Sequence, residues 1–199
     1  MLASGRGTVL KSLIKNCASG KISSQIVLVI SNNSDSGAIK LSRKAGINSV
    51  HLSEKMFKSR KSYIRRFLDI LKENKIDFIL LAGYMKKIPY EIIRKYRNRI
   101  LNIHPSLLPS FGGKGMYGLN VHKAVIDAGV KISGVTVHIV NEDYDSGPIL
   151  IQKAVPVKDD DTPESLMKRI QLHERKLYVQ AIHMIESGKI QISKNGIII

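Results

Sequence analysis

The sequence predicts an α/β fold with a Rossmann-like, mixed and mostly parallel sheet flanked by helices. Short β-branched runs alternate with amphipathic stretches over the first hundred residues, an order typical of a parallel sheet covered by helices. Two further β-rich runs lie close together after residue 130, which indicates an antiparallel pair at one end of the sheet. The 199 residues are 43% hydrophobic and 24% charged, a composition suited to one compact domain over residues 1–199.

The strands are expected at apolar and β-branched runs. Those of the first half are Gln25 to Ser31, Ser49 to Leu52, Phe78 to Ala82 and Ile100 to Ile103. Val135 to Val140 and Ile149 to Val157 flank a turn at Asp145 to Pro148. Met1 to Ala3 precede a glycine-rich loop of a kind that normally follows a strand, so either the first strand is a stub or the true start lies upstream.

Two long helices are expected. Ser59 to Lys75 has apolar residues at helical spacing and basic residues on its other faces, as in a helix that covers a sheet. The last helix is expected to begin at Pro163, capped by Thr162 or the aspartate before it, and to run to about Glu186. The three aspartates before it indicate a turn and cap, with metal ligation as the alternative. Lys189 to Ile199 is expected to form a short final strand or tail.

The chain is strongly basic, with 32 Lys and Arg against 16 Asp and Glu, a formal net charge of +16. This favours phosphorylated ligands or nucleic acid, but the basic residues are spread from Lys11 to Lys194, which is equally typical of a generally basic surface. The longest apolar runs are far shorter than the roughly 20 residues of a membrane span. The start shows no secretory signal, so a cytoplasmic protein without a membrane partner is expected. Cys17, the only cysteine, excludes an internal disulfide.

Two segments are rich in glycine. Gly5 to Val9 comes directly before a helical stretch, so its backbone N–H groups and the helix N-terminus would favour a bound phosphate. It lacks the third glycine of a dinucleotide loop and the lysine of a nucleoside triphosphate loop, and a plain strand-to-helix turn is the alternative. Gly112 to Gly118 is expected to be a surface loop or a lid near a site.

The string from Asn102 to Pro109 holds the main candidates for chemistry. It lies at the end of an expected strand, where open α/β sheets bind their ligands. Asn102 and His104 are two residues apart and point the same way, and an amide beside an imidazole suits acyl transfer, because both can stabilise an oxyanion and the imidazole can donate a proton. The structural alternative is a polar strand end before a rigid proline turn.

His138 and Asp145 are the second pair of candidates. His138 lies in the β-rich run after residue 134 and Asp145 in the turn that follows it. A carboxylate beside an imidazole raises its pKa and keeps it protonated. Read singly, a core histidine and a turn acid are the simpler interpretations, so the functional one rests on their appearance together with Asn102 and His104. No His-x-x-x-His spacing is present, and no metal is expected.

Four segments together resemble the phosphoribosylglycinamide formyltransferase family: Asn102 to Pro109, Leu81 to Met85, Gly134 to Val140, and Tyr144 to Ile149. The resemblance covers nearly the whole chain. It implies an enzyme of purine (IMP) synthesis that moves the formyl group of 10-formyltetrahydrofolate to the amine of N1-(5-phosphoribosyl)glycinamide. Small molecules would then be its partners, without a metal cofactor and without nucleic acid, in a monomer or homodimer.

The resemblance assigns catalysis to Asn102, His104 and Asp145, with His138 in support. The amine attacks the formyl carbon directly, and Asn102 and a protonated His104 stabilise the tetrahedral oxyanion. Asp145 holds His104 protonated and helps to remove the amine proton. The ribonucleotide-phosphate half is expected in residues 1–100, and the catalytic and folate-binding half in residues 101–199.

The resemblance also implies two binding sets. The ribonucleotide would bind at Gly7, Thr8, Val9, Gln171 and Glu174. The folate would bind at Arg60, Met85, Lys86, Lys87, Ile88, Asn102, Asn141, Glu142 and Asp143. Three departures from the family pattern accompany them. Val9 stands where an asparagine is usual, and the charge of Arg6 is a candidate to compensate. Lys87 replaces an apolar residue, and the loop between Pro109 and His122 is longer than in many relatives.

Three alternatives remain beside this interpretation. Methionyl-tRNA formyltransferases share the Asn-x-His and Asp motifs, and the basic charge would suit tRNA, but they are expected to carry a separate RNA-binding domain. Formyltetrahydrofolate deformylases share the three catalytic residues but are expected to carry a further N-terminal domain. A basic nucleic-acid-binding module would leave Asn102, His104 and Asp145 without a role.

Overall fold

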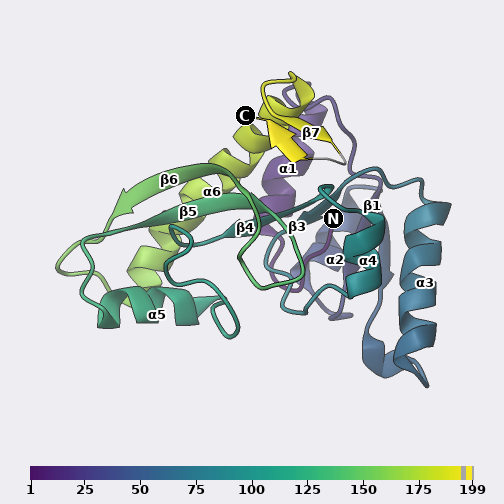
Figure 1. Cartoon of the computed structure of the whole chain (residues 1–199), viewed down its shortest axis with the longest axis horizontal. Helices are drawn as coiled ribbons and strands as arrows, with labels where there is room; N and C mark the ends of the chain where they lie inside the picture. The colour runs from purple at the N-terminus through teal and green to yellow at the C-terminus, as the bar shows by residue number, and fades with distance from the viewer. Residues whose placement is uncertain (194–195, 199) are drawn as a thin grey trace.

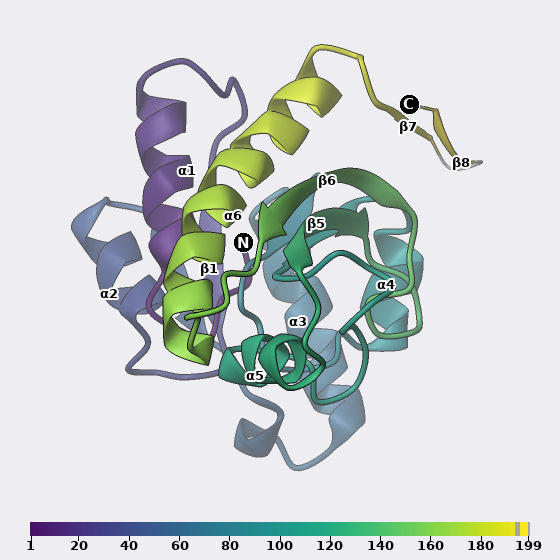
Figure 2. The same cartoon turned by 90° about the vertical axis from the view of Figure 1, so that its left-hand side faces the viewer.

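A mixed β-sheet forms the centre of the molecule, with helices on both faces (Figures 1 and 2). The computed structural model describes residues 1–193 and 196–198, with side chains described as far as Ile192. The strands of the sheet are β1 (Leu28–Ser31), β2 (Asn48–His51), β3 (Ile79–Leu81), β4 (Ile100–His104), β5 (Ile132–Ile139) and β6 (Ile149–Pro156). The helices are α1 (Thr8–Ala18), α2 (Gly37–Lys44), α3 (Arg60–Glu73), α4 (Tyr90–Lys95), α5 (Leu119–Asp127) and α6 (Pro163–Glu186), with one 3-10 turn at Glu54–Met56.

The sheet is parallel over most of its width and antiparallel at one edge, as the sequence predicts. Strand β1 pairs in parallel with β2, and β3 pairs in parallel with β4. Strands β5 and β6 follow in antiparallel order. Leu2 joins the two parallel pairs, because it forms parallel bridges to Ile30 and to Leu81. The short first strand is therefore present as a stub that lies between β1 and β3.

Two apolar cores hold the helices to the two faces of the sheet. On one face α1 and α6 pack against β4, β5 and β6, with Tyr178 fully buried among them. On the other face α3 and α4 pack against β1 and β3 around Phe67, which is also fully buried. Each such side chain contributes roughly 1.5–3 kcal/mol when it leaves water, so these contacts stabilise the layers. Figure 2 shows the sheet between the two sets of helices.

Side-chain caps start both of the long helices that the sequence predicts. The Ser59 hydroxyl accepts a hydrogen bond from the Ser62 N–H at the start of α3. Thr162 and Ser165 form a reciprocal capping box at the start of α6, just before and within the turn that contains Pro163. Asp161 accepts bonds from the Lys158 N–H and from Arg169, so this aspartate belongs to the turn and cap as expected.

The chain after α6 forms a hairpin where a single strand or tail is expected. Strand β7 (Gln191–Ser193) pairs antiparallel with β8 (Gly196–Ile198). Residues 194, 195 and 199 of the expected segment lie outside the described residues. Within the described residues, every helix is too short or too polar to cross a bilayer.

Candidate active site

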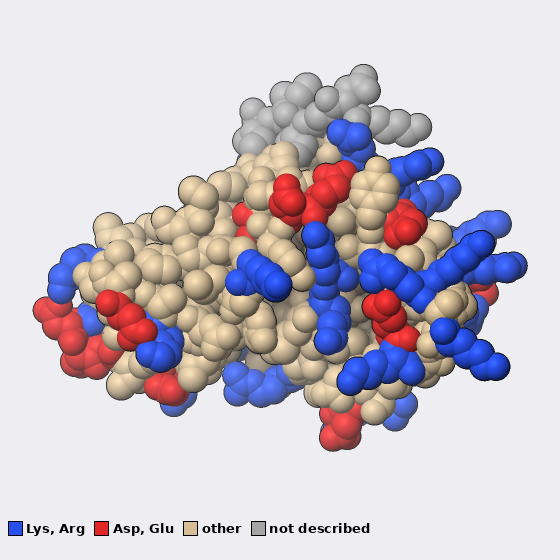
Figure 3. Space-filling view, turned by 60° about the horizontal axis from the view of Figure 1, so that its bottom comes forward, with Lys and Arg blue, Asp and Glu red and all other residues tan. Residues whose placement is uncertain are grey.

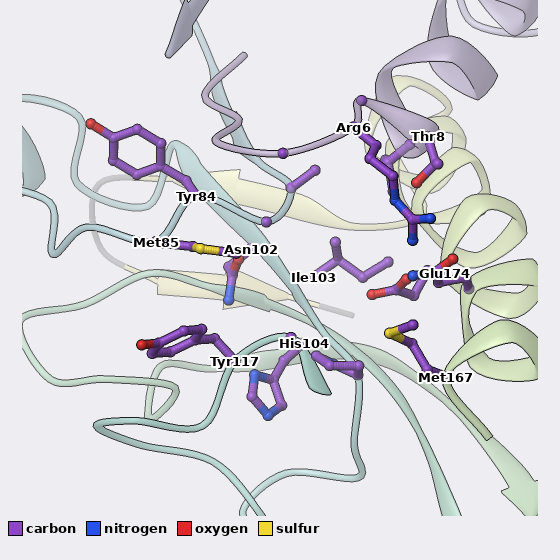
Figure 4. Close-up of a pocket in the computed structure, with 18 of the residues that line it drawn as sticks. Arg6, Thr8, Tyr84, Met85, Asn102, Ile103, His104, Tyr117, Met167 and Glu174 are labelled. Carbon is purple, nitrogen blue, oxygen red and sulfur yellow. The ribbon is translucent and has the colours of Figure 1, made fainter. Parts of the chain in front are cut away.

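A cleft opens at the carboxyl ends of β3 and β4, where the sequence places Asn102 and His104. It lies between the loop before α1, the inner side of α6 and the segment before α5 (Figure 4). All three expected catalytic residues line it, and so do all five expected ribonucleotide ligands: Asn102, His104, Asp145, Gly7, Thr8, Val9, Gln171 and Glu174. Residues that are far apart in the sequence therefore meet at one place, as expected from their motifs.

The glycine-rich loop presents the N-terminus of α1 to the cleft. Gly7 caps the helix with φ 77°, and an added Cβ there would lie 3.0 Å from the Ala38 Cα, so both its conformation and the close approach of α2 favour glycine. Gly7 has no side chain to occupy the first N–H groups of α1, which leaves them available to an anion. The Arg6 side chain points into the cleft toward Glu174 (Figure 4).

The Val9 side chain, which stands where the resemblance leads us to expect an asparagine, packs into the core at the start of α1. Its side chain is 8% exposed and packs in the core beneath α1 and α6. It therefore stabilises the position of the helix, while only its backbone N–H remains for a ligand. Arg6 lines the same cleft as Thr8 and Val9, so compensation by its charge stays a prediction.

Glu174 lies on the α6 wall of the cleft in partly buried surroundings. Burial raises the pKa of its carboxyl group to about 7, against the opposing charge of Arg175. A large fraction of Glu174 is therefore neutral at pH 7. A neutral carboxyl group both donates and accepts hydrogen bonds, which suits the hydroxyl groups of a sugar.

His104 has each ring nitrogen opposite a different acceptor. Its Nε2 atom lies 2.8 Å from the Phe111 carbonyl oxygen, and its Nδ1 atom lies 3.5 Å from Asp145 Oδ2. Because a carbonyl only accepts, Nε2 carries the proton of the neutral ring, and Nδ1 is the nitrogen that exchanges protons beside Asp145. Phe111 holds this orientation with φ 56°, an uncommon value for a residue with a side chain.

The charge state of His104 differs from the sequence-based expectation. Burial lowers its pKa, and this outweighs the opposite effects of Asp145 and of the Phe111 carbonyl. In the free protein this lowered pKa favours the neutral ring over the protonated His104 that the resemblance implies. The sequence shows that a carboxylate is near but not that the imidazole is only 3% exposed.

Asp145 lies at the centre of the polar cluster. It has φ 51°, and it accepts hydrogen bonds from the Gly113 N–H at 3.0 Å and from Asn102 Nδ2 at 3.3 Å. Burial raises the pKa of its carboxyl group, but the nearby His138 ring, the charge of His104 and the Gly113 N–H together outweigh burial and lower it. Asp145 is therefore an anion at neutral pH, ready to stabilise a proton that reaches His104.

His138 fixes the amide of Asn102. The Nδ1–H of His138 donates to the Ile139 carbonyl at 2.9 Å, so its Nε2 accepts from Asn102 Nδ2 at 3.0 Å. The second N–H of Asn102 points to Asp145 and makes the longer of the two bonds. His138 thus has the supporting position that the resemblance implies, and the weaker contact of Asn102 is the one that an oxyanion would displace.

A buried hydroxyl network holds the turn after His104. The Thr136 hydroxyl donates to the Ser106 carbonyl at 2.7 Å and accepts from the Leu108 N–H at 3.0 Å. Ser106 in turn donates to the Ser110 carbonyl at 2.6 Å. The Leu108–Pro109 peptide bond within this turn is cis. These contacts from β5 fix the path of the chain that carries the Phe111 carbonyl to His104.

A second cavity shares Asn102 and Asp145 with the first cleft. Six of the nine expected folate ligands line it: Lys86, Lys87, Ile88, Asn102, Asn141 and Asp143. His138 and Tyr144 complete the part nearest the cluster. The Lys87 ammonium lies 5.2 Å from the centre of the Tyr144 ring, so this departure from the family pattern forms a cation–π contact at the edge of the cavity.

The structure separates three expected folate ligands from that cavity. Met85 lines the first cleft beside Asn102 (Figure 4). Arg60 starts α3, forms an ion pair with Glu54 at 3.4 Å and lines a different groove between α3 and Glu91. Glu142 is exposed and lines neither cavity. Arg60 and Glu142 thus stand apart from the site in this conformation.

Some lining residues were not expected from the sequence. Met116, Tyr117, His122 and Met167 line the first cleft, and Tyr144 the second. The glycine-rich segment before α5 is the one signal that pointed toward them, since Gly112 to Gly118 was expected to lie near a site. Among the described residues, no group of three or more His, Cys, Asp or Glu is arranged to hold a metal ion.

Fold and polar cluster together define a class of enzyme that transfers an acyl group at the carboxyl edge of an open sheet. A family model described as formyl transferase matches residues 1–182, and the chain belongs to this family. It is 42% identical to the phosphoribosylglycinamide formyltransferase of Arabidopsis thaliana chloroplasts, over 99% of this chain and 68% of that protein. It is 35% identical to the phosphoribosylglycinamide formyltransferase of Haemophilus influenzae, over 98% and 90%.

The solved structures agree with these relatives. The glycinamide ribonucleotide transformylase 1 of Symbiobacterium toebii superposes with a TM-score of 0.90 and 36% identity, over 100% of this chain and 91% of that one. A protein of this named activity therefore has the same overall fold as this chain.

Proposed function

We propose that this protein transfers the formyl group of 10-formyltetrahydrofolate to the amine of N1-(5-phosphoribosyl)glycinamide, in purine synthesis. The observation that carries the proposal is that two cavities with different linings share Asn102 and Asp145. One cavity has an anion-binding helix end and the other lies between the Lys86–Ile88 segment and the turn before β6. Two substrates that enter from opposite sides would meet at the shared residues, as a direct transfer between them requires.

The amine of the ribonucleotide attacks the formyl carbon, and the carbonyl π bond moves onto the formyl oxygen. The new oxyanion accepts a hydrogen bond from the Asn102 N–H that otherwise donates to Asp145, because this is the longer of the two bonds that Asn102 Nδ2 makes. The nitrogen that attacks becomes positively charged and must lose a proton. His104 Nδ1, which lies 3.5 Å from Asp145 Oδ2, accepts the proton, directly or through one water.

Asp145 stabilises the imidazolium that results, because its carboxylate lies 3.5 Å from Nδ1. The same proton then passes to the folate nitrogen as its bond to the formyl carbon breaks and the carbonyl re-forms. The products are the N-formyl ribonucleotide and tetrahydrofolate, and His104 returns to its neutral state. His104 thus acts first as a base, when it accepts the amine proton, and then as an acid, when it donates that proton to the folate nitrogen.

The proposal also covers the co-substrate, the cellular compartment and the oligomeric state. The formyl folate acts as co-substrate, without a metal. The protein acts in the cytoplasm on small molecules, as a monomer or homodimer. Sedimentation of the purified protein and fractionation of its source cells test these two points.

An acceptor comparison tests the proposed reaction. Loss of 10-formyltetrahydrofolate is followed by absorbance with no acceptor, with glycinamide ribonucleotide and with initiator methionyl-tRNA. Turnover that requires the ribonucleotide is expected. Turnover with tRNA would move the assignment to translation, and turnover without an acceptor would indicate a deformylase.

A further inference from the structure

His122 is a buried histidine in the site that the proposed mechanism does not use. It lies in α5, is 2% exposed and lines the ribonucleotide side of the cleft but not the folate cavity. Its Nδ1 atom is completely enclosed and has no hydrogen-bond partner among the residues that the structure describes. Burying a polar atom without a partner reduces stability, so an apolar side chain would pack better at this position.

The charge state of His122 restricts what it can bind. Burial lowers its pKa to about 4, and the charge of nearby His104 lowers it too. The ring is therefore neutral at pH 7, and because Nδ1 is enclosed, Nε2 is the atom that it offers to a ligand in the cleft, as an N–H donor or as a lone pair. A neutral ring is a poor ligand for a phosphate, which instead has Arg6 and the N-terminus of α1 at the far end of the same cleft.

The position of His122 indicates which part of the acceptor it faces. His122 and His104 line the same cleft, and the charge of His104 acts on His122. In the proposed mechanism His104 lies where the amine reacts. The part of the ribonucleotide between the amine and the sugar is an uncharged amide, with one carbonyl acceptor and one N–H donor. That chemistry complements a neutral imidazole.

We propose that His122 is a specificity residue that hydrogen-bonds the uncharged glycinamide part of the acceptor, next to the amine that receives the formyl group. The assignment rests on the proposed function. It predicts a residue whose loss weakens binding of one substrate only. It also gives a reason for keeping an imidazole at a position where the fold leaves Nδ1 without a partner.

Steady-state kinetics of three variants test the assignment. His122→Leu is expected to raise the KM for glycinamide ribonucleotide about 3- to 10-fold, as for one lost neutral hydrogen bond, with the KM for 10-formyltetrahydrofolate unchanged. His122→Gln keeps a donor and an acceptor and is expected to restore most of the acceptor affinity. Ser133→Ala is the matched control, because the Ser133 hydroxyl is also buried and unpartnered but lies outside the cleft.

Thermal unfolding adds a readout that separates function from packing. His122→Leu is expected to unfold at the same temperature as the wild type or higher, because it removes an unsatisfied polar atom. An unchanged acceptor KM in His122→Leu, or a KM that rises equally for both substrates with a lower Tm, would overturn this assignment alone. Absence of transfer in the wild-type protein would overturn the proposed function together with it.

Discussion

At the scale of the residue, the site depends on which nitrogen of each histidine carries a proton. Two backbone carbonyls set this, since Phe111 accepts from His104 and Ile139 from His138. Residue types and spacing predict Asn102, His104, Asp145 and His138 because all four lie in recognisable motifs. Neither carbonyl could be predicted, because a backbone group has no signature in the sequence. The burial that lowers the pKa of His104 is likewise a property of the folded chain.

Asp145→Asn tests the electrostatic role of the carboxylate. The amide keeps the size of the side chain but removes the charge that stabilises the His104 imidazolium, so kcat is expected to fall about 10²-fold or more. Turnover is measured with both substrates saturating, and circular dichroism checks the fold. Asp127→Asn is the control, since Asp127 is an exposed acid of α5 that pairs with Lys123. Near-normal turnover in Asp145→Asn would contradict the mechanism.

At the scale of the element, helices and strands were predicted within a few residues where periodicity and caps agree. Strand β4 and helix α6 are examples, since both begin where the apolar pattern and the capping residues place them. The hairpin of β7 and β8 was not predicted as a pair, because each strand has three residues and little pattern. The approach of α2 to the phosphate loop also required the structure, since it depends on contacts between Gly7 and Ala38.

Tyr178 ties α6 to the strands that carry the site. Its hydroxyl is fully buried and lies 3.0 Å from both the Leu81 and the Leu101 carbonyl oxygens, so it bridges the ends of β3 and β4. Tyr178→Phe leaves these acceptors without that donor and is expected to reduce the free energy of unfolding by about 1–3 kcal/mol.

Urea unfolding measures this loss. Tyr90→Phe is the control, because Tyr90 is 55% exposed on α4. A loss in Tyr178→Phe no larger than that in the control would show that the hydroxyl does not join the helix to the sheet.

At the scale of the whole molecule, basic and acidic residues are distributed unevenly. Residues 54–99, which include α3 and α4, hold 14 of the 32 Lys and Arg but five of the 16 acidic residues. Figure 3 shows basic side chains gathered over the half of the surface where Figure 1 places α3. The excess of basic residues in this stretch is already present in the sequence, and the fold places the stretch on one face of the sheet.

Two buried groups of the cleft give opposite dependences of stability on pH. The pKa of His122 is lowered from 6.5 to about 4, so its contribution is complete above pH 6.5 and is lost as pH falls toward 4. The pKa of Glu174 is raised from 4.5 to about 7, so its contribution is complete below pH 4.5 and is lost as pH rises toward 7. Each effect is at most about 3 kcal/mol, and in the wild type they oppose each other.

Replacing His122 and replacing Glu174 are therefore expected to change the slope of unfolding free energy against pH in opposite directions. When the pH is lowered from 7.5 to 5, the unfolding free energy of His122→Leu is expected to rise relative to that of the wild type. When the pH is raised from 5 to 7.5, the unfolding free energy of Glu174→Gln is expected to rise relative to that of the wild type. Urea unfolding at both pH values measures the two differences. His183→Gln, at an exposed position of α6, is the control. Parallel curves for all three variants would show that these two groups titrate alike in the folded and unfolded chains.

The central claim is that one formyl carbon passes directly between two substrates that meet at Asn102 and Asp145. The most direct measurement uses 10-formyltetrahydrofolate with a ¹³C-labelled formyl group and follows the label by NMR with glycinamide ribonucleotide present. The account predicts that the label appears as the formamide of the ribonucleotide, in an amount equal to the tetrahydrofolate formed. Label recovered as free formate would contradict it, because the formyl group would then have gone to water.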